Sequence, residues 1–306
     1  MRNPFWIRLQ RLFLIFLTTR NWLSSILVWL GFYQKKIVIF RNGMEFRLEK
    51  SNWVKYLEHV YLFHHFPEAK ISGDSLQIKY KNIDLVFDGG PYGWSTILEI
   101  FGGEPYLEFF EMTDIKGKTV LDVGAAFGDT AVLFMLEGAA RVVAVEAFPG
   151  YFKLALKNIK TNGFESQCET MLSAIGAHSG ILRIDTNLED MFGIGVQENE
   201  IGEEVPIITI EQIIQDKNIK DAILKLDVEG YEYEILLNAS KEVLRNFSDM
   251  VIEYHYGHEK IISHLEAAGF SMSFTGPFNV KMPHLKDEAA KNMQIGNIYA
   301  KRLNFQ

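Results

Sequence analysis

The chain has 306 residues, of which 48% are hydrophobic and 23% are charged. This composition is typical of a folded globular protein and excludes disordered, fibrous and collagen-like chains. A single cysteine excludes an internal disulfide framework and a thiolate metal cluster. The length accommodates one large domain, or one domain with an appendage of roughly 100 residues.

The formal net charge of −8 is unevenly distributed along the chain. Residues 1–48 contain eight Lys and Arg residues and one acid, Glu45, whereas the remainder has a balance of −15. An acidic body lacks the cations that a broad nucleic-acid surface needs, so we expect no nucleic-acid partner. The basic segment is instead suited to an anionic membrane surface.

Residues 1–36 form a basic and apolar leader that we expect to be helical. Residues 12–34 hold one charge, Arg20, and the longest uncharged stretch has 14 residues, whereas a spanning helix needs about 20. The apolar run 12–19 ends without a small-residue cleavage site, which disfavours a signal peptide. Three interpretations remain: helices packed on the body, a helix lying on lipid or a partner, and a spanning helix, which the short uncharged stretch disfavours. We therefore expect a cytoplasmic protein, with peripheral membrane contact through 1–36 as the open alternative.

Residues 37–115 are predicted to form an N-terminal α+β region. Asn42-Gly43, between two apolar runs, is a strong signal for a hairpin over 37–48. A helix over 52–66, a second hairpin over 75–88 and a helix over 95–112, interrupted near Gly102-Gly103, are expected to follow.

From residue 116 to 306 the pattern changes to strands alternating with helices. Strands are expected at 119–123, 141–146, 168–175, 180–185, 222–228, 249–255, 270–275 and 295–302, and helices start after Gly128 and at Pro149, Thr209, 230 and 258. Such alternation predicts a doubly wound parallel sheet, and the last two runs suggest an antiparallel end. The expected fold is therefore α/β: a Rossmann-like doubly wound sheet, mostly parallel with an antiparallel closing strand, preceded by the α+β region.

The segment 120–129, VLDVGAAFGD, predicts a strand running through a glycine-rich turn into a helix. Glycines let the backbone turn sharply and approach a nucleotide-like ligand. Glu146 ends the next strand, where a carboxylate can accept both hydroxyls of a ribose. Because G-x-G-x-x-G is absent, the spacing does not fit a pyrophosphate and favours S-adenosylmethionine over a dinucleotide.

The run Lys225-Leu-Asp227-Val-Glu229 carries the second group of candidate residues. Strand alternation places the three charged side chains on one face. A surface row of ion pairs is one interpretation, but the flanking residues are apolar, so we expect a buried and coupled charge cluster. These residues are candidate catalytic groups.

Glu253-x-His255-x-x-His258 is compatible with a metal site, a catalytic base or ordinary packing. Ligands scattered over a strand end and a helix start are a weak metal signal. We expect no metal, and keep His255 as a candidate catalytic residue.

Four segments together resemble the FkbM family of class I S-adenosylmethionine-dependent methyltransferases. They are VLDVGAAFGDTA, VEAFPGYFKLALKNIKTNG, SAIGAHSGILRI and LKLDVEGYEYEILLNAS followed by VIEYH, and the resemblance covers about 118–302. It implies that Asp122 and the 124–128 backbone contact methionine and ribose, Glu146 binds the ribose hydroxyls, and Asp227 lies over the sulfonium and the acceptor. The implied cofactor-binding residues are Asp122, Gly124, Ala125, Ala126, Phe127, Gly128, Asp129, Glu146, Ala147, Phe148, Ser173, Ala174 and Asp227. Ala126 and Asp129 depart from the family, which often has Asn and an aromatic there.

The leading functional hypothesis is methylation of a hydroxyl on a sugar, glycolipid or secondary metabolite, a small-molecule or glycan acceptor. Asp227, Glu229 or His255 would accept the proton, with Lys225 in the same charge cluster. Two alternatives remain: an NAD(P)-dependent oxidoreductase on a similar fold, and a non-catalytic membrane-docking protein.

Overall fold

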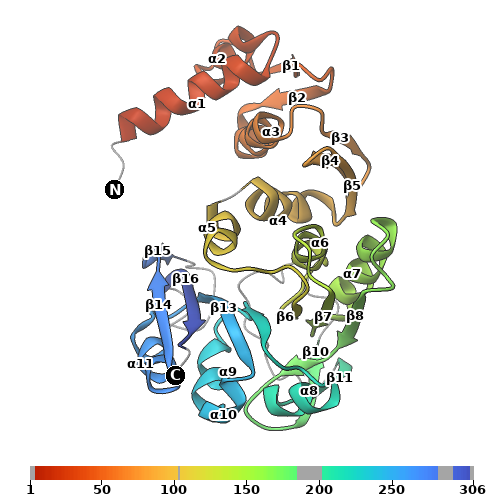
Figure 1. Cartoon of the computed structure of the whole chain (residues 1–306). Coiled ribbons are helices and arrows are strands. Elements are labelled where there is room, and N and C mark those ends of the chain that lie inside the picture. Colours follow the sequence, from red (N-terminus) through yellow and green to blue (C-terminus); the bar gives the residue numbers. More distant parts are fainter. Residues whose placement is uncertain (1–3, 103, 185–201, 282–291, 304–306) are drawn as a thin grey trace. The chain divides into compact units, whose positions relative to one another are not determined.

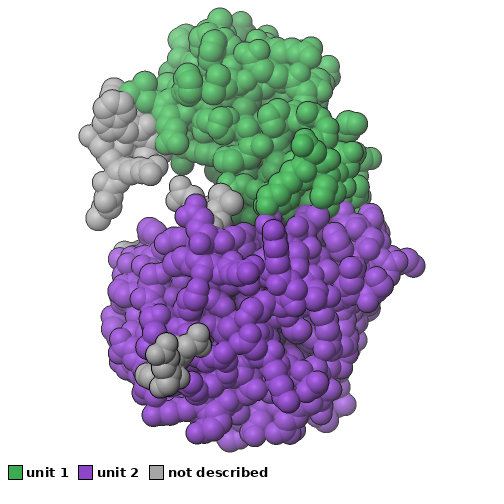
Figure 2. Space-filling view, viewed as in Figure 1, with its two compact units in different colours: residues 1–103 green, residues 104–306 purple. Residues whose placement is uncertain are grey.

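The computed structural model describes residues 4–102, 104–184, 202–281 and 292–303. The chain divides into two compact units, Met1–Gly103 and Glu104–Gln306, coloured green and purple in Figure 2. From the sequence we placed boundaries after residues 36 and 115. The division into compact units falls after Gly103 and places α5 (Glu104–Met112) in the second unit; the boundaries drawn from the sequence stay predictions.

The first unit contains both hairpins that the sequence predicts (Figure 1). Lys81 and Asn82 have φ values of +48° and +66°, the left-handed pair that a tight two-residue hairpin turn requires. A short strand, β3, joins the second hairpin and was not predicted. The elements are α1 (Pro4–Thr18), α2 (Trp22–Trp29), β1 (Lys35–Ile39), β2 (Glu45–Glu49), a 3₁₀ turn (Lys50–Asn52), α3 (Trp53–His65), β3 (Lys70–Ser72), β4 (Ser75–Tyr80), β5 (Ile83–Asp88) and α4 (Gly90–Gly102).

One face of the leader helices packs into the core of this unit. Leu14 and Ile15 of α1 and Val28 of α2 are buried, and α1 lies against α3. Ser25 and Tyr56 share a buried hydrogen bond of 2.8 Å between their hydroxyls. None of the described helices combines the length and the apolar character that crossing a membrane requires.

The second unit is built on one large sheet with the strand order β14-β16-β13-β12-β6-β7-β8. Strand β16 runs antiparallel to β13 and β14, and the pairs from β13 to β8 are parallel. This arrangement confirms the predicted fold class. The strands are β6 (Thr119–Val123), β7 (Arg141–Glu146), β8 (Cys168–Leu172), β12 (Ala222–Leu226), β13 (Phe247–Tyr254), β14 (Phe270–Phe274), β15 (Phe278–Lys281) and β16 (Asn292–Arg302).

Helices and a small second sheet complete this unit. The expected helix over 230–245 is split, because Ser240 caps a new helix by accepting from the Val243 N–H at 3.3 Å. Strands β11 and β15 were not predicted. The remaining elements are α6 (Asp129–Leu136), α7 (Pro149–Thr161), β9 (Ala174–Ile175), β10 (Gly180–Ile184), β11 (Glu203–Ile208), α8 (Ile210–Asp216), α9 (Glu232–Asn238), α10 (Lys241–Leu244) and α11 (Glu259–Ala267).

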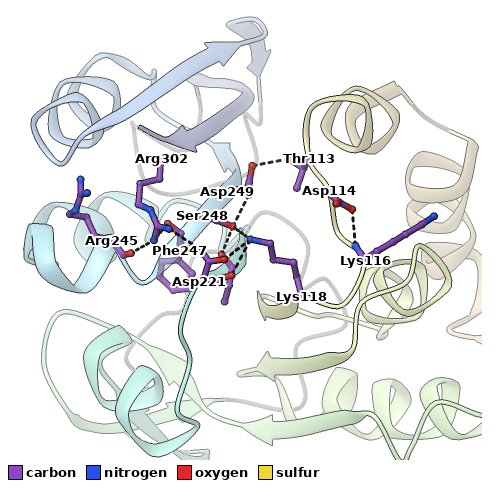
Figure 3. Close-up of polar contacts among 11 residues, drawn as sticks. Thr113, Asp114, Lys116, Lys118, Asp221, Arg245, Phe247, Ser248, Asp249 and Arg302 are labelled. Carbon is purple, nitrogen blue, oxygen red and sulfur yellow. Dashed lines mark hydrogen bonds and ion pairs between the residues drawn. The ribbon is translucent and has the colours of Figure 1, made fainter. Parts of the chain in front are cut away.

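Ion pairs tie the central strands together at their amino ends (Figure 3). Asp221, just before β12, forms ion pairs with Lys118 Nζ at 2.8 Å and with an Arg302 guanidinium nitrogen at 2.6 Å. Lys118 also donates to the Ser248 hydroxyl at 2.9 Å. These side chains therefore connect the strands at the amino edge of the sheet. The residues identified from the sequence as candidate site residues lie at the opposite, carboxyl edge.

Candidate active site at the carboxyl edge of the sheet

The candidate site lies where the strand order reverses. The chain passes from β6 to β7 and β8 on one side and later returns to β12 on the other. In open α/β sheets, ligands bind outside the carboxyl ends of the strands at this point. The loop after β6 and the end of β12 both contribute to it.

The loop after β6 depends on backbone conformations that favour glycine. Gly124, Ala126 and Gly128 have φ values of +78°, +42° and +76°. A Cβ on Gly124 would lie 1.8 Å from the carbonyl oxygen of Asp227, so no side chain fits there. From the sequence we attributed this glycine to a close approach by the cofactor; the structure shows that the neighbouring strand end requires it as well.

Glu146, at the end of β7, holds this loop in place. One carboxylate oxygen accepts from the Ala126 N–H and the other from the Phe148 N–H, both at 2.7 Å. Burial raises the pKa of Glu146 to about 7, although the two backbone bonds and Lys225 act in the opposite direction. Each oxygen keeps a second lone pair for a further donor, which is compatible with a ribose diol.

A cavity of about 410 Å³ opens beside Glu146. Ser173 lines it, but its hydroxyl donates to the Pro206 carbonyl at 2.8 Å and so fixes β11. Phe148 is outside the lining and packs on the apolar cluster beneath β10 and β11. The residues lining the cavity include Val123, Gly124, Glu146, Ala147, Ser173, Ala174, Ile175, Leu182, Ile207, Val228, Tyr231 and Glu234.

Three further residues that the resemblance implies, Ala125, Phe127 and Asp129, form contacts within the protein. The Ala125 N–H donates to the Val145 carbonyl at 3.0 Å. The Phe127 ring contacts that of Tyr151 with centroids 4.8 Å apart. Asp129 is buried at the start of α6 and accepts from the Thr130 N–H at 3.0 Å. Their contacts with a cofactor stay predictions.

A buried charge cluster links β6 to β12. Lys225 Nζ lies 3.4 Å from Asp122 Oδ1 and 3.8 Å from Asp227 Oδ2, and it donates to the Gly124 carbonyl at 2.5 Å. Asp122 also accepts from the Thr130 hydroxyl at 2.6 Å. The side chains of Lys225 and Asp122 are 3% and 0% exposed, whereas that of Asp227 is 32% exposed. Asp227 is therefore the member of this cluster that a substrate can reach.

The turn after β12 is organised by Glu232, which the sequence analysis did not assign. Its Oε1 accepts from the Val228 N–H at 2.8 Å and the Gly230 N–H at 3.2 Å. Glu229 lies in this turn with a φ of +53°, so strand alternation does not extend to it. Glu232 belongs to the segment LKLDVEGYEYEILLNAS that carries the family resemblance. An acid in the first turn of the helix that follows was the signal that could have identified it.

His255, at the end of β13, is buried between two acids. Nδ1 lies 3.1 Å from Glu232 Oε1, and Nε2 lies 3.4 Å from Glu229 Oε2. The Glu232 contact is an ion pair without the alignment of a hydrogen bond. Burial acts to lower the pKa of His255, but the two acids outweigh it and raise this pKa to about 12. A protonated imidazole donates and cannot act as a base near neutral pH.

Asp227, Glu232 and His255 could together hold a divalent cation, since one ligand atom from each lies within 4.8 Å of the others. Of the three residues that the sequence analysis considered as metal ligands, this group contains His255 but not Glu253 or His258. The His258 ring instead stacks on that of Tyr254, with centroids 5.4 Å apart. When no metal is bound, the imidazolium supplies the positive charge between the acids.

The sheet order and the glycine-rich loop after β6 define a Rossmann-like fold. Residues 122–272 match the family model described as the Methyltransferase FkbM domain. The second unit thus contains a domain of this family, in agreement with the resemblance drawn from the sequence.

Curated relatives match a short part of the chain. The ribosomal protein L11 methyltransferase of Vibrio campbellii is 33% identical over 66 residues, and that of Vibrio cholerae 35% over 66. The match covers 22% of this chain and 22% of each relative, so the chain spans about a fifth of their length.

Among solved structures, a putative RNA methyltransferase from Pyrococcus horikoshii is 16% identical, with a TM-score of 0.37, over 74% of this chain and 93% of that one. A precorrin-6y C5,15-methyltransferase from Geobacter metallireducens is 13% identical, with a TM-score of 0.38, over 65% of this chain and 87% of that one.

Proposed function

We propose that the protein is an S-adenosylmethionine-dependent methyltransferase. The observation that carries this proposal is the cavity at the carboxyl edge, which combines Glu146, Gly124 and a largely apolar lining. The match to the FkbM domain supports it. An adenosine cofactor without phosphates requires a carboxylate that accepts hydrogen bonds from the ribose hydroxyls and an apolar lining for the adenine.

In the proposed reaction, bound S-adenosylmethionine supplies a methyl group activated on a sulfonium. Asp227 accepts the proton from the acceptor hydroxyl as the new C–O bond forms. Burial raises the pKa of Asp227, with Lys225 acting in the opposite direction; a raised pKa makes the carboxylate a stronger base. His255, protonated between Glu229 and Glu232, positions the turn that carries Asp227.

For the acceptor we propose a hydroxyl on a sugar, a glycolipid or a secondary metabolite. The acidic balance of the chain beyond residue 48 supports an acceptor without phosphate charges over a nucleic acid. The 66-residue match to ribosomal protein L11 methyltransferases favours one second candidate, the transfer of methyl groups to a protein.

Intact-mass detection of methyl transfer would test the proposal. The full chain is incubated with S-adenosylmethionine and panels of glycans, glycolipids and basic proteins. We expect a gain of one methyl mass on a hydroxyl-bearing acceptor. A gain on proteins alone would favour the second candidate. Stabilisation of the fold by NAD(P) but not by S-adenosylhomocysteine would favour the oxidoreductase alternative and overturn the proposal.

The pKa of Glu146 predicts how cofactor affinity depends on pH. Two ribose hydroxyls donate to the ionised carboxylate, so binding selects that form. Since this pKa is about 7 in the free protein, affinity should be nearly constant above about pH 8 and fall below it, by about tenfold between pH 8 and pH 6. Calorimetric titration with S-adenosylhomocysteine measures this profile.

The matched control is Glu146→Gln, which cannot ionise. The affinity of this variant for S-adenosylhomocysteine should be weaker at pH 8 and should no longer fall between pH 8 and pH 6. An equal pH profile in both proteins would show that another group governs the titration and would contradict the ribose assignment.

A further inference from the structure

The leader carries a second apolar face that its packing does not use. On α1, the residues at helical spacings i, i+3, i+4, i+7 and i+8 are exposed, opposite the buried Leu14 and Ile15. They are Leu9, Leu12, Phe13, Phe16 and Leu17. On α2 and the segment after it, the exposed apolar residues are Leu23, Trp29, Leu30, Phe32 and Tyr33. We call these ten side chains the apolar face.

This concentration is not the ordinary scatter of apolar side chains over a protein surface. Of the 21 large hydrophobic side chains exposed among the described residues, 12 lie between Leu9 and Val54. Large contiguous apolar patches mark sites that bind proteins or membranes. The nature of the partner then depends on what surrounds the patch.

Cations lie beside the apolar face. Arg41 donates to the carbonyls of Phe16 and Leu17 at 3.1 and 2.6 Å. Arg20 donates to the Arg41 carbonyl at 3.0 Å, and Lys36 Nζ lies 4.0 Å from the centre of the Tyr33 ring. The sequence up to residue 48 contains one acid. Positive charges beside exposed aromatic side chains are complementary to an anionic lipid surface.

A groove between the leader helices and α3 adds a feature suited to lipid. Its volume is about 290 Å³, and it is lined by Arg11, Leu12, Ile15, Ile26, Trp29 and Trp53. Five of these six side chains are apolar, and the sixth is a cation. An acyl chain against the apolar wall, with an anionic headgroup on Arg11, fits this lining.

We propose that the apolar face of α1 and α2 docks reversibly on an anionic lipid bilayer, parallel to its surface. No described helix can span a membrane, and the buried face of α1 stays in the protein core. Docking would hold the second unit near acceptors that are anchored in lipid, a consequence that rests on the proposed function. Binding to vesicles itself requires no methyl transfer.

Sedimentation with vesicles tests the proposal with the full chain. We expect binding to mixed phosphatidylserine–phosphatidylcholine vesicles, little binding to phosphatidylcholine alone, and release by salt as the charges are screened. Phe13→Ser together with Phe16→Ser should weaken partitioning by about tenfold or more, because two aromatic side chains no longer enter the interface. Arg11→Glu should weaken it severalfold.

Matched controls lie in the second unit. Phe278 is 64% exposed and Phe13 59%, so Phe278→Ser should leave partitioning unchanged. Arg183→Glu makes the same change of charge as Arg11→Glu at an exposed ion pair. Equal effects of the control and leader variants would overturn the proposal.

Three other outcomes would also overturn it. Absence of binding to anionic vesicles at low salt would mean that the face has another occupant. A dimer in solution that Phe13→Ser dissociates would identify that occupant as a second copy of the chain. Retention on vesicles at high salt and alkaline pH would indicate insertion instead of docking.

Discussion

Replacing Asp227 by asparagine is expected to lower the rate of methyl transfer by about 10²–10⁴-fold, the usual contribution of a general base. The amide keeps the size of the side chain but cannot accept the proton of the acceptor. Asp227 is the reachable carboxylate of the buried cluster, 32% exposed beside Lys225 at 3%. Because the backbone of Asp227, not its carboxylate, contacts Gly124, the loop should keep its conformation and cofactor affinity should change little.

Single-turnover rates, measured beside the affinity for S-adenosylhomocysteine, separate chemistry from binding. Glu229→Gln is the matched comparison, since Glu229 is 37% exposed in the same turn and should cost less. Equal losses of rate and affinity in Asp227→Asn would make Asp227 a cofactor ligand. An unchanged rate would move the base to another group, with Glu229 the first candidate.

Much of the fold could be predicted because its signals are local. Asn42-Gly43 and Lys81-Asn82 lie at the turns of the two antiparallel hairpins. The apolar runs that became β6, β7 and β12 are buried. Two of the missed strands are short, β3 with three residues and β15 with four. The third, β11, has six residues, but they include two acids and Pro206, which are not typical of a strand. Their strand character comes from pairing with a neighbour that only the tertiary fold provides.

The same distinction between local signals and tertiary contacts applies to the residues of the candidate site. Glu146 and Asp122 could be identified from their positions at strand ends near a glycine-rich turn. The tasks of Glu232 and His255 could not, because they depend on a contact between α9 and the residue that follows β13. A histidine near a candidate site suggested a base; two acids, one on each ring nitrogen, favour a protonated positioning group instead. Sequence spacing shows which residues lie at the same edge of the sheet, but not which neighbouring groups determine their protonation state.

Lys225→Met should cost the largest amount of folding stability. Lys225 lies 3.4 Å from Asp122, and both side chains are almost fully buried. Removing one partner of a buried pair typically costs about 3–5 kcal/mol, because the remaining charge has neither water nor a counter-charge. The lost bond to the Gly124 carbonyl also loosens the loop beside the cavity. Chemical denaturation should therefore show a lower free energy of unfolding by about that amount.

Two companion variants separate the charge effect from the loss of packing. Lys118→Met removes the same side chain from an ion pair whose acid, Asp221, is 59% exposed, and it should cost about 1 kcal/mol. Adding Asp122→Asn to Lys225→Met removes both charges and should recover a large part of the stability, since the amide can still accept from the Thr130 hydroxyl. If the double variant were less stable than Lys225→Met by the full cost of Asp122→Asn alone, the two residues would not be energetically coupled. Lys225 would then stabilise the fold through packing alone. In that case its positive charge, between Asp122 and Asp227, would not be needed to hold β6 beside β12 for the chemistry proposed at Asp227.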